Sequence, residues 1–143
     1  MNNFTDNFWK KFFILASLWN ISAAPLCLIL YIYFPSLIYT SEGLQYTHNP
    51  VFDSFYYIVV AAVLLFGVGY YMPSRDLMLN RGIIWLGAIA KIGLAVVIFQ
   101  MYFLKYLTLL VPILLVGDII WALFFFVFLN QTKDRVEINN LVG

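Results

Sequence analysis

Two residues of opposite charge, Lys91 and Asp118, lie inside long apolar segments of the sequence. Near the centre of a bilayer a charged side chain is energetically costly, so such residues usually face the interior of a helix bundle and pair with one another. Intramembrane ionisable residues also mark ligand sites and ion pathways. Lys91 and Asp118 therefore predict an ion pair that either locks the fold or lines a site for a polar group or a proton.

The composition supports a membrane setting for this pair. Of the 143 residues, 64% are hydrophobic and only 10% are charged, whereas about a quarter of the residues of a soluble domain are charged. We therefore predict one integral membrane domain over residues 1–143, with the lipid bilayer as its partner. A net charge of +1 provides no basic stripe, which argues against a nucleic-acid partner. The single cysteine, Cys27, excludes an intrachain disulfide.

Four segments are long enough to cross the hydrocarbon core, which takes about 20 mainly apolar residues. They are residues 12–34, 55–72, 82–104 and 107–129. Their uninterrupted apolar runs do not alternate as barrel strands do, so we predict an all-α, polytopic four-helix bundle. Only Lys105 and Tyr106 separate the last two spans, which predicts a tight antiparallel hairpin. The 35–54 loop is long and partly apolar, so it should lie on the membrane surface or fold over the bundle as a lid.

Basic residues predict the orientation, because cytoplasmic flanks of membrane helices collect lysine and arginine. One side would carry six of them and the other side only Lys105. The six are Lys10, Lys11, Arg75, Arg81, Lys133 and Arg135. Both termini should therefore be cytoplasmic and the 35–54 loop external. A cleaved signal peptide ending at "SAA" before Pro25 is the alternative, but the apolar run continues through "PLCLILYIYF" to a full span.

The predicted spans place three polar residues at one depth. At 1.5 Å per residue, Lys91 lies about 13 Å and Asp118 about 16 Å from the cytoplasmic boundary, and Asn20 in the first span lies about 12 Å from it. We name Asn20, Lys91 and Asp118 the midplane layer. Three helices would each contribute one member of this layer.

Three tryptophans, Trp19, Trp85 and Trp121, lie in the spans that carry the midplane layer. Apolar walls around a few convergent polar groups are typical of a ligand pocket, so these side chains are candidate ligand contacts. Aromatic residues make up 20% of the chain, however, and packing or lipid contact is the alternative interpretation.

The short loop after the second span contains a second candidate site. Arg75, Asp76 and Arg81 would lie at headgroup level, where Asp76 and Arg81 could join as a cytoplasmic gate. Arginines that snorkel to lipid phosphates are the alternative. His48 is the only histidine, and no catalytic triad, zinc motif, pair of haem histidines or phosphate loop can be assembled. We therefore predict no metal and no cofactor.

The four-helix plan, "GVGYY" at 67–71, Lys91 and "GDIIW" at 117–121 resemble small bacterial membrane proteins of the DoxX-like kind. More distantly, the plan is similar to the sterol-binding EXPERA domains. The resemblance implies a small-molecule or lipid-like ligand inside the bundle, or a membrane subunit of a redox complex. It also implies the inner membrane of a bacterium.

The sequence as a whole favours a protein that binds or translocates a small amphipathic or anionic molecule, such as a lipid-like, quinone-like or organic-acid compound. Lys91 would supply the counter-charge, and Asp118 would set orientation and protonation. The alternative is a non-catalytic accessory subunit, in a homo-oligomer or a larger membrane complex, in which Lys91 and Asp118 only lock the fold. An enzyme that uses Asp118 as an acid or base is a third hypothesis.

Overall fold

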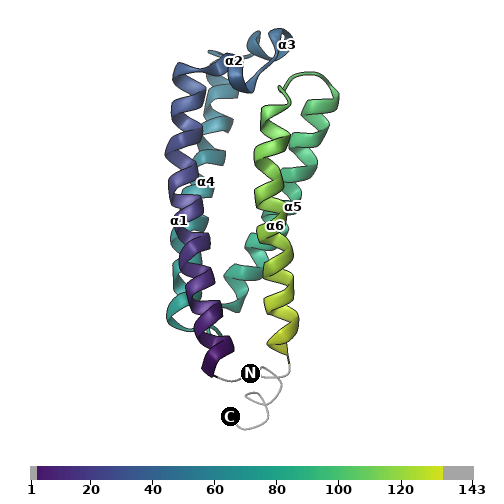
Figure 1. Cartoon of the computed structure of the whole chain (residues 1–143). Coiled ribbons are helices and arrows are strands. Elements are labelled where there is room, and N and C mark those ends of the chain that lie inside the picture. Colours follow the sequence, from purple (N-terminus) through teal and green to yellow (C-terminus); the bar gives the residue numbers. More distant parts are fainter. Residues whose placement is uncertain (1–2, 134–143) are drawn as a thin grey trace.

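The computed structural model describes residues 3–133 and shows six helices in this part of the chain (Figure 1). Four are long and two are short. In chain order they are α1 (Asn3–Tyr33), α2 (Pro35–Ile38), α3 (Ser41–Leu44), α4 (Pro50–Arg75), α5 (Arg81–Phe103) and α6 (Leu110–Gln131). The predicted all-α four-helix fold is confirmed.

All four long helices are long and apolar enough to cross a membrane. Many of their large aliphatic side chains point outward; Leu65 is 70% exposed, Val96 63% and Leu123 60%. An apolar surface of this extent suits lipid rather than water. The chain is therefore a multi-pass membrane protein.

Two of the observed helices, α1 and α4, are clearly longer than the predicted spans. α1 begins at Asn3 rather than near residue 12, and α4 begins at Pro50, inside the predicted loop, and continues through Pro73 to Arg75. Hydropathy marks the apolar stretch, whereas backbone hydrogen bonding continues into the polar flanks. Asn49 caps the start of α4, because its side chain accepts hydrogen bonds from the backbone N–H groups of Val51 and Phe52.

The long helices form two antiparallel hairpins, α1 with α4 and α5 with α6 (Figure 1). α1 begins and α6 ends at one end of the bundle, which we name the terminal end. The opposite end, which carries α2 and α3, is the loop end. Within the first hairpin the backbones approach closely at Gly67, where a Cβ atom would lie 2.9 Å from the backbone nitrogen of Ile21.

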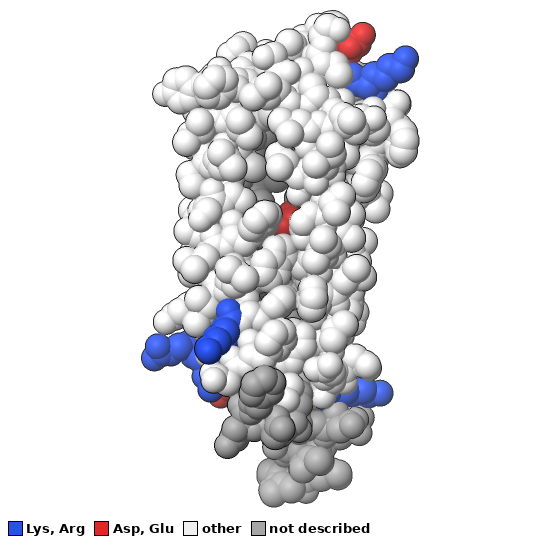
Figure 2. Space-filling view, in the orientation of Figure 1, with Lys and Arg blue, Asp and Glu red and all other residues white. Residues whose placement is uncertain are grey.

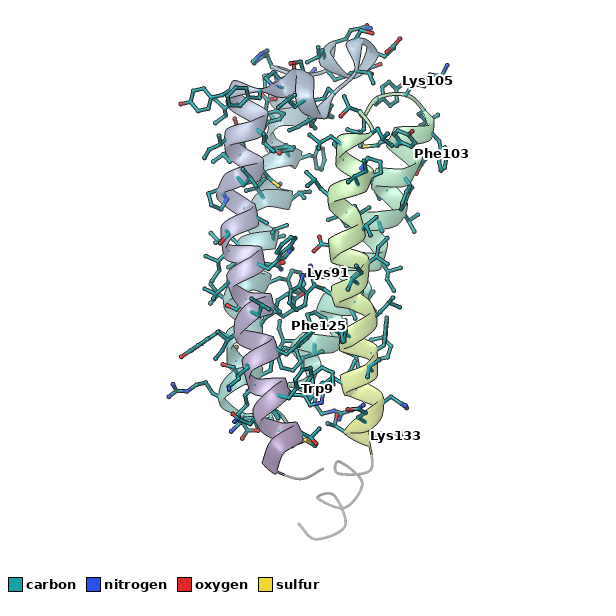
Figure 3. All side chains as sticks on the ribbon, in the orientation of Figure 1. Trp9, Lys91, Phe103, Lys105, Phe125 and Lys133 are labelled. Carbon is teal, nitrogen blue, oxygen red and sulfur yellow. The ribbon has the colours of Figure 1, made fainter. Side chains whose placement is uncertain are left out.

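Basic side chains gather at the terminal end, and Lys105 lies at the loop end (Figures 2 and 3). The helix ends and the turn at the terminal end carry Lys10, Lys11, Arg75, Arg81 and Lys133. Arg135 lies outside the described residues. The assignment of the terminal end to the cytoplasm stays a prediction.

A cluster of aromatic and aliphatic side chains joins the two hairpins in the terminal half of the bundle. We name it the terminal core. Its ring contacts include Phe13 with Phe128 at 5.0 Å and Tyr70 with Phe125 at 4.8 Å between centroids. Its members are Trp9, Phe13, Ala16, Tyr70, Leu77, Ile84, Ala88, Phe125, Phe128 and Leu129. The cluster fixes the hairpins against each other on one side of the midplane layer.

Backbone pairing joins the hairpins at the loop end. Tyr39 and Leu107 form an isolated antiparallel bridge. The Thr40 N–H donates to the Tyr106 carbonyl at 3.1 Å, and the Thr108 N–H donates to the Ile38 carbonyl at 2.8 Å. We name this contact between residues 37–40 and 105–108 the loop-end bridge.

The loop-end bridge also changes the predicted connections. The 35–54 loop contains α2, α3 and the start of α4, and it folds over the end of the bundle (Figure 1). The α5–α6 connection is longer than Lys105 and Tyr106, because α5 ends at Phe103 and α6 begins only at Leu110. Lys105 turns the chain with a φ of 63°, and the residues after it are used for pairing rather than for helix.

Candidate functional site

Lys91 lies near mid-height of the bundle and points into its interior (Figure 3). Its side chain is 7% exposed, and its Nζ atom lies 2.5 Å from Oδ1 of Asp118. The same Nζ donates to Oδ1 of Asn20 at 3.3 Å. The structure thus brings together the three residues of the midplane layer, from α5, α6 and α1.

Tyr70 of α4 completes the surroundings of Lys91. The ammonium lies 5.9 Å from the centroid of the Tyr70 ring, within the range of a cation–π contact. The tyrosine reaches this position because Gly87 of α5 has no side chain; a Cβ atom there would lie 2.2 Å from the Tyr70 hydroxyl oxygen. All four long helices therefore contribute to the layer.

Tyr70 is a site residue that the sequence did not predict. The glycines of "GVGYY" indicate close helix packing, but they do not show which neighbouring residue faces the lysine. Gly87, which makes room for Tyr70, lies in a different helix, and a single sequence does not pair the two positions. The signal that could have found Tyr70 is its depth, because it belongs to the part of α4 that lies beside the first half of α5.

The electrostatics of the layer are balanced. The ammonium of Lys91 has three N–H donors; one binds a carboxylate and one an amide oxygen. Burial of an ion is compensated only when good geometry and further hydrogen bonds accompany the opposite charge. Asp118 supplies the charge, and Asn20 supplies the additional hydrogen bond, so the layer has no net charge.

The two partners of the ion pair differ in exposure. The Lys91 side chain is 7% exposed, whereas the Asp118 side chain is 22% exposed. Figure 2 shows an opening between the two hairpins at mid-height, with acidic atoms inside it. Within residues 3–133, Oδ1 of Asp118 binds Lys91, and no hydrogen bond reaches Oδ2. The carboxylate therefore presents an acceptor to the opening while the lysine stays buried behind it.

Two of the three predicted tryptophans, Trp19 and Trp121, contact each other beside Gly117, the residue that precedes Asp118. The rings of Trp19 and Trp121 are 6.4 Å apart, and Gly117 leaves space for Trp19, whose ring would be 3.3 Å from a Cβ atom there. Trp85 has a different ring partner, because it packs edge-on against Phe126 at 5.8 Å; its exposure of 51% is close to the 47% of Trp19. The structure thus brings Trp19 and Trp121 together, with Trp121 also packed against Phe12 of α1 at 4.9 Å, and turns Trp85 toward Phe126.

The three residues of the predicted gate do not meet. Arg81 donates to the hydroxyl of Thr132 and to the carbonyl of Leu129 at 2.9 Å, so it holds the end of α6. A cation at a helix C-terminus interacts favourably with the helix dipole. Arg75 lies 3.4 Å from the hydroxyl of Tyr71. The expected contact between Asp76 and Arg81 is absent from the described residues.

Asp76 instead organises the α4–α5 turn. One oxygen of its carboxylate accepts hydrogen bonds from the backbone N–H groups of Leu79 at 3.0 Å and Met78 at 2.9 Å. These two bonds lower the pKa of Asp76, because they favour the charged form. The residue acts as a turn cap rather than as part of a gate.

A second polar cluster, also not predicted from the sequence, ties α1 to α4 near the loop end. The Tyr31 hydroxyl donates to Asp53, and the Tyr56 hydroxyl donates to the carbonyl of Cys27 at 2.9 Å. The rings of Tyr31 and Tyr56 stack at 4.0 Å. Every polar group named here has a partner inside this hairpin, so the cluster serves packing.

No protein family, curated protein or solved structure matches this chain. The midplane layer is the feature of the described residues that points to a function.

Proposed function

We propose that the protein binds a small amphipathic or anionic molecule at the midplane layer, or carries it through the membrane. One observation carries the proposal: the side chain of Asp118 is 22% exposed at an opening in the bundle, although its ion-pair partner Lys91 is buried. A pair that served only to lock the helices would be most stable if packing closed over both charges. The open side of Asp118 is where a ligand would bind.

The surroundings of Asp118 also fit a ligand pocket. Trp19 is 47% exposed beside Gly117, and its ring lies 6.4 Å from that of Trp121. Apolar walls with a small number of fixed polar groups are the usual composition of small-molecule sites. The resemblance to DoxX-like and EXPERA-like proteins belongs to this proposal too, because it implies a ligand held inside the bundle.

The test is to identify molecules that co-purify with the protein. Wild-type protein is purified in a mild detergent, and bound molecules are extracted and analysed by mass spectrometry. The matched variant is Lys91→Met combined with Asp118→Leu, because replacing a buried ion pair by hydrophobic residues preserves folding. We expect one class of amphiphile with the wild type and its loss from the double variant.

The control is Leu123→Ala, which changes an outward-facing residue of α6 that is 60% exposed. It should retain the molecule that the wild type retains. If the wild type and the folded double variant carry the same molecules in the same amounts, the proposed function is wrong.

A second candidate is an accessory subunit in which the layer has only a structural role. The observation that favours it is that Asn20, Tyr70, Lys91 and Asp118 come from the four different long helices. Such a layer fixes the packing of the whole bundle. In this case the double variant should match the wild type in every property, including its co-purified molecules.

A further inference from the structure

We infer that the midplane layer is reached sideways from the bilayer and takes a membrane-dissolved amphiphile whose polar group donates a hydrogen bond to Asp118. This inference rests on the proposed function and deepens it, because it selects among the ligand classes that the sequence left open. Three features of the bundle support it: the two ends are closed, the opening is lateral, and the accessible polar atom is an acceptor.

The terminal core closes the route from the terminal end. Phe13, Phe125 and Phe128 are 0% exposed, and Tyr70 is 1% exposed. These rings contact one another across the hairpins, with Phe13 and Phe125 5.7 Å apart and Tyr70 and Phe125 4.8 Å apart. Close-packed aromatic side chains leave no path for a hydrated molecule along the bundle axis.

The loop-end bridge closes the other end. The segment before α3 is fastened to the α5–α6 turn by the hydrogen bonds of Thr40 and Thr108, and the Thr108 hydroxyl also donates to the Leu37 carbonyl at 2.5 Å. Three bridge residues, together with Tyr31, form a buried cluster in which Tyr31, Ile38, Tyr39 and Leu107 are each at most 8% exposed. A water-soluble organic acid therefore has no direct route to the layer from this end.

The remaining access is lateral. The opening in Figure 2 lies between α1 and α6 at the depth of Lys91. Both helices are long and apolar enough to cross a membrane, so at mid-height this opening should face hydrocarbon rather than water. A large, mainly apolar side chain lies beside this opening: Trp19 of α1, which is 47% exposed and lies against Gly117, the residue that precedes Asp118. A molecule that reaches Asp118 by this route must first dissolve in the bilayer.

The chemistry of the accessible atom selects the polar group of the ligand. An ionised carboxylate only accepts hydrogen bonds, and its Oδ1 is already bound to Lys91 at 2.5 Å. An anionic ligand would meet the like charge of Asp118 and would have to displace it from the lysine. A hydroxyl group adds a hydrogen bond to Oδ2 and leaves the ion pair intact, so a hydrogen-bond donor fits the site better than an anion.

The test compares three probes with similar alkyl chains: hexadecanol, hexadecyl methyl ether and hexadecanoate. The alcohol donates a hydrogen bond, the ether only accepts, and the carboxylate is an anion. Each is added to purified wild-type protein in detergent, and the bound fraction is measured by native mass spectrometry. A hydrogen bond to a charged acceptor should make the alcohol bind about 10- to 100-fold more tightly than the ether.

The folded double variant Lys91→Met with Asp118→Leu should bind the alcohol and the ether equally, and Leu123→Ala should behave as the wild type. Equal binding of alcohol and ether to the wild type would overturn the inference about the donor and leave the proposed function in place. Tighter binding of hexadecanoate would overturn it in favour of Lys91 as the counter-charge. If no probe binds and the same spectra show a dimer, in which a second copy of the chain covers the opening, the inference is wrong. The proposed function is contradicted only if, in addition, no amphiphile co-purifies with the protein from membranes.

Discussion

The terminal half and the loop half of the bundle are built differently on the two sides of the midplane layer. All large side chains that are less than 2% exposed within residues 3–133 come from the terminal half, among them Phe13, Tyr70 and Phe125. The buried side chains of the loop-half cluster are 4–8% exposed, and three of the four belong to the loop-end bridge or its flanks. Dense packing holds one half, and hydrogen bonding at the far end holds the other.

This difference explains how a membrane bundle can keep an opening beside a buried charge pair. Apolar side chains gain little by leaving lipid for a protein interior, so membrane helices associate through close packing and hydrogen bonds rather than through the hydrophobic effect. The terminal core supplies the packing, and the loop-end bridge supplies hydrogen bonds. Between the terminal core and the loop-end bridge the two hairpins do not need to pack tightly against each other. Asp118 lies in this loosely packed part.

The largest expected effect concerns the environment of the two ends, because it is all-or-none. Single cysteines are introduced at Ser41 in the loop end and at Leu79 in the α4–α5 turn, both exposed, in a Cys27→Ala background. Basic residues gather at the terminal end, so Ser41→Cys should be labelled from outside and Leu79→Cys only from the cytoplasm. A membrane-impermeant maleimide applied to intact cells and to inverted vesicles measures this.

Labelling of both positions from one side would contradict the four-span arrangement. Labelling of each from the opposite side to that expected would reverse the orientation and keep the fold. The Cys27→Ala protein without an added cysteine is the control for non-specific labelling.

The next largest effect is expected at the boundary between the halves. Lys91→Met leaves Asp118 without its counter-charge and should lower the free energy of unfolding by about 3–5 kcal/mol. Adding Asp118→Leu should recover most of that loss, because no isolated charge remains. Denaturation in mixed micelles, followed by tryptophan fluorescence or circular dichroism, gives the free energies. A double variant as unstable as Lys91→Met alone would show that the two residues are not energetic partners.

Much of the midplane layer, which forms the boundary between the two halves, could be predicted from the sequence. The apolar runs determine the number of helices, and the cost of a charge in lipid requires Lys91 and Asp118 to pair, so depth along each helix was enough to predict the midplane layer. The exposure of Asp118 could not be predicted, because it depends on how far the hairpins separate. The pairing of residues 37–40 with 105–108, which joins the hairpins at the loop end, is likewise not indicated by any periodicity in the sequence.

Other features could not be predicted from the sequence for the same reason, because they depend on contacts between distant positions. Arg81 holds the end of α6 through Thr132 and Leu129, and Trp85 turns toward Phe126. Residue type and depth alone made Arg81 a gate candidate and Trp85 a pocket candidate. Rotation about each helix axis decides such contacts, and the outer surface of a membrane helix is as apolar as its inner face, so the sequence gives little information about rotation.

A smaller effect is expected from a pair of identical substitutions in α5. A Cβ atom at Gly87 would lie 2.2 Å from the Tyr70 hydroxyl, whereas a Cβ atom at Gly93 would meet nothing within 4 Å. Gly87→Ala should therefore destabilise by about 1–3 kcal/mol through overpacking. Gly93→Ala should be neutral or stabilise by up to about 1 kcal/mol, because alanine favours helix. Unfolding in mixed micelles compares the two, and equal effects would show that the terminal half is not closely packed around Tyr70.

The smallest effect is expected at the α4–α5 turn, which closes the terminal end outside the membrane. Two backbone hydrogen bonds lower the pKa of Asp76 in the folded protein, so ionised Asp76 stabilises the fold above the pKa that the group has in the unfolded chain. This contribution is lost as the pH falls through the lower, folded pKa. The thermal midpoint of the wild type should therefore exceed that of Asp76→Asn at neutral pH, and the gap should narrow on acidification toward about pH 3. Because Asp76 is exposed, solvent screening keeps the gap small. If the difference in thermal midpoint between the wild type and Asp76→Asn does not change with pH, the Asp76 side chain caps the turn without help from its charge. Electrostatics would then not contribute to the stability of this turn.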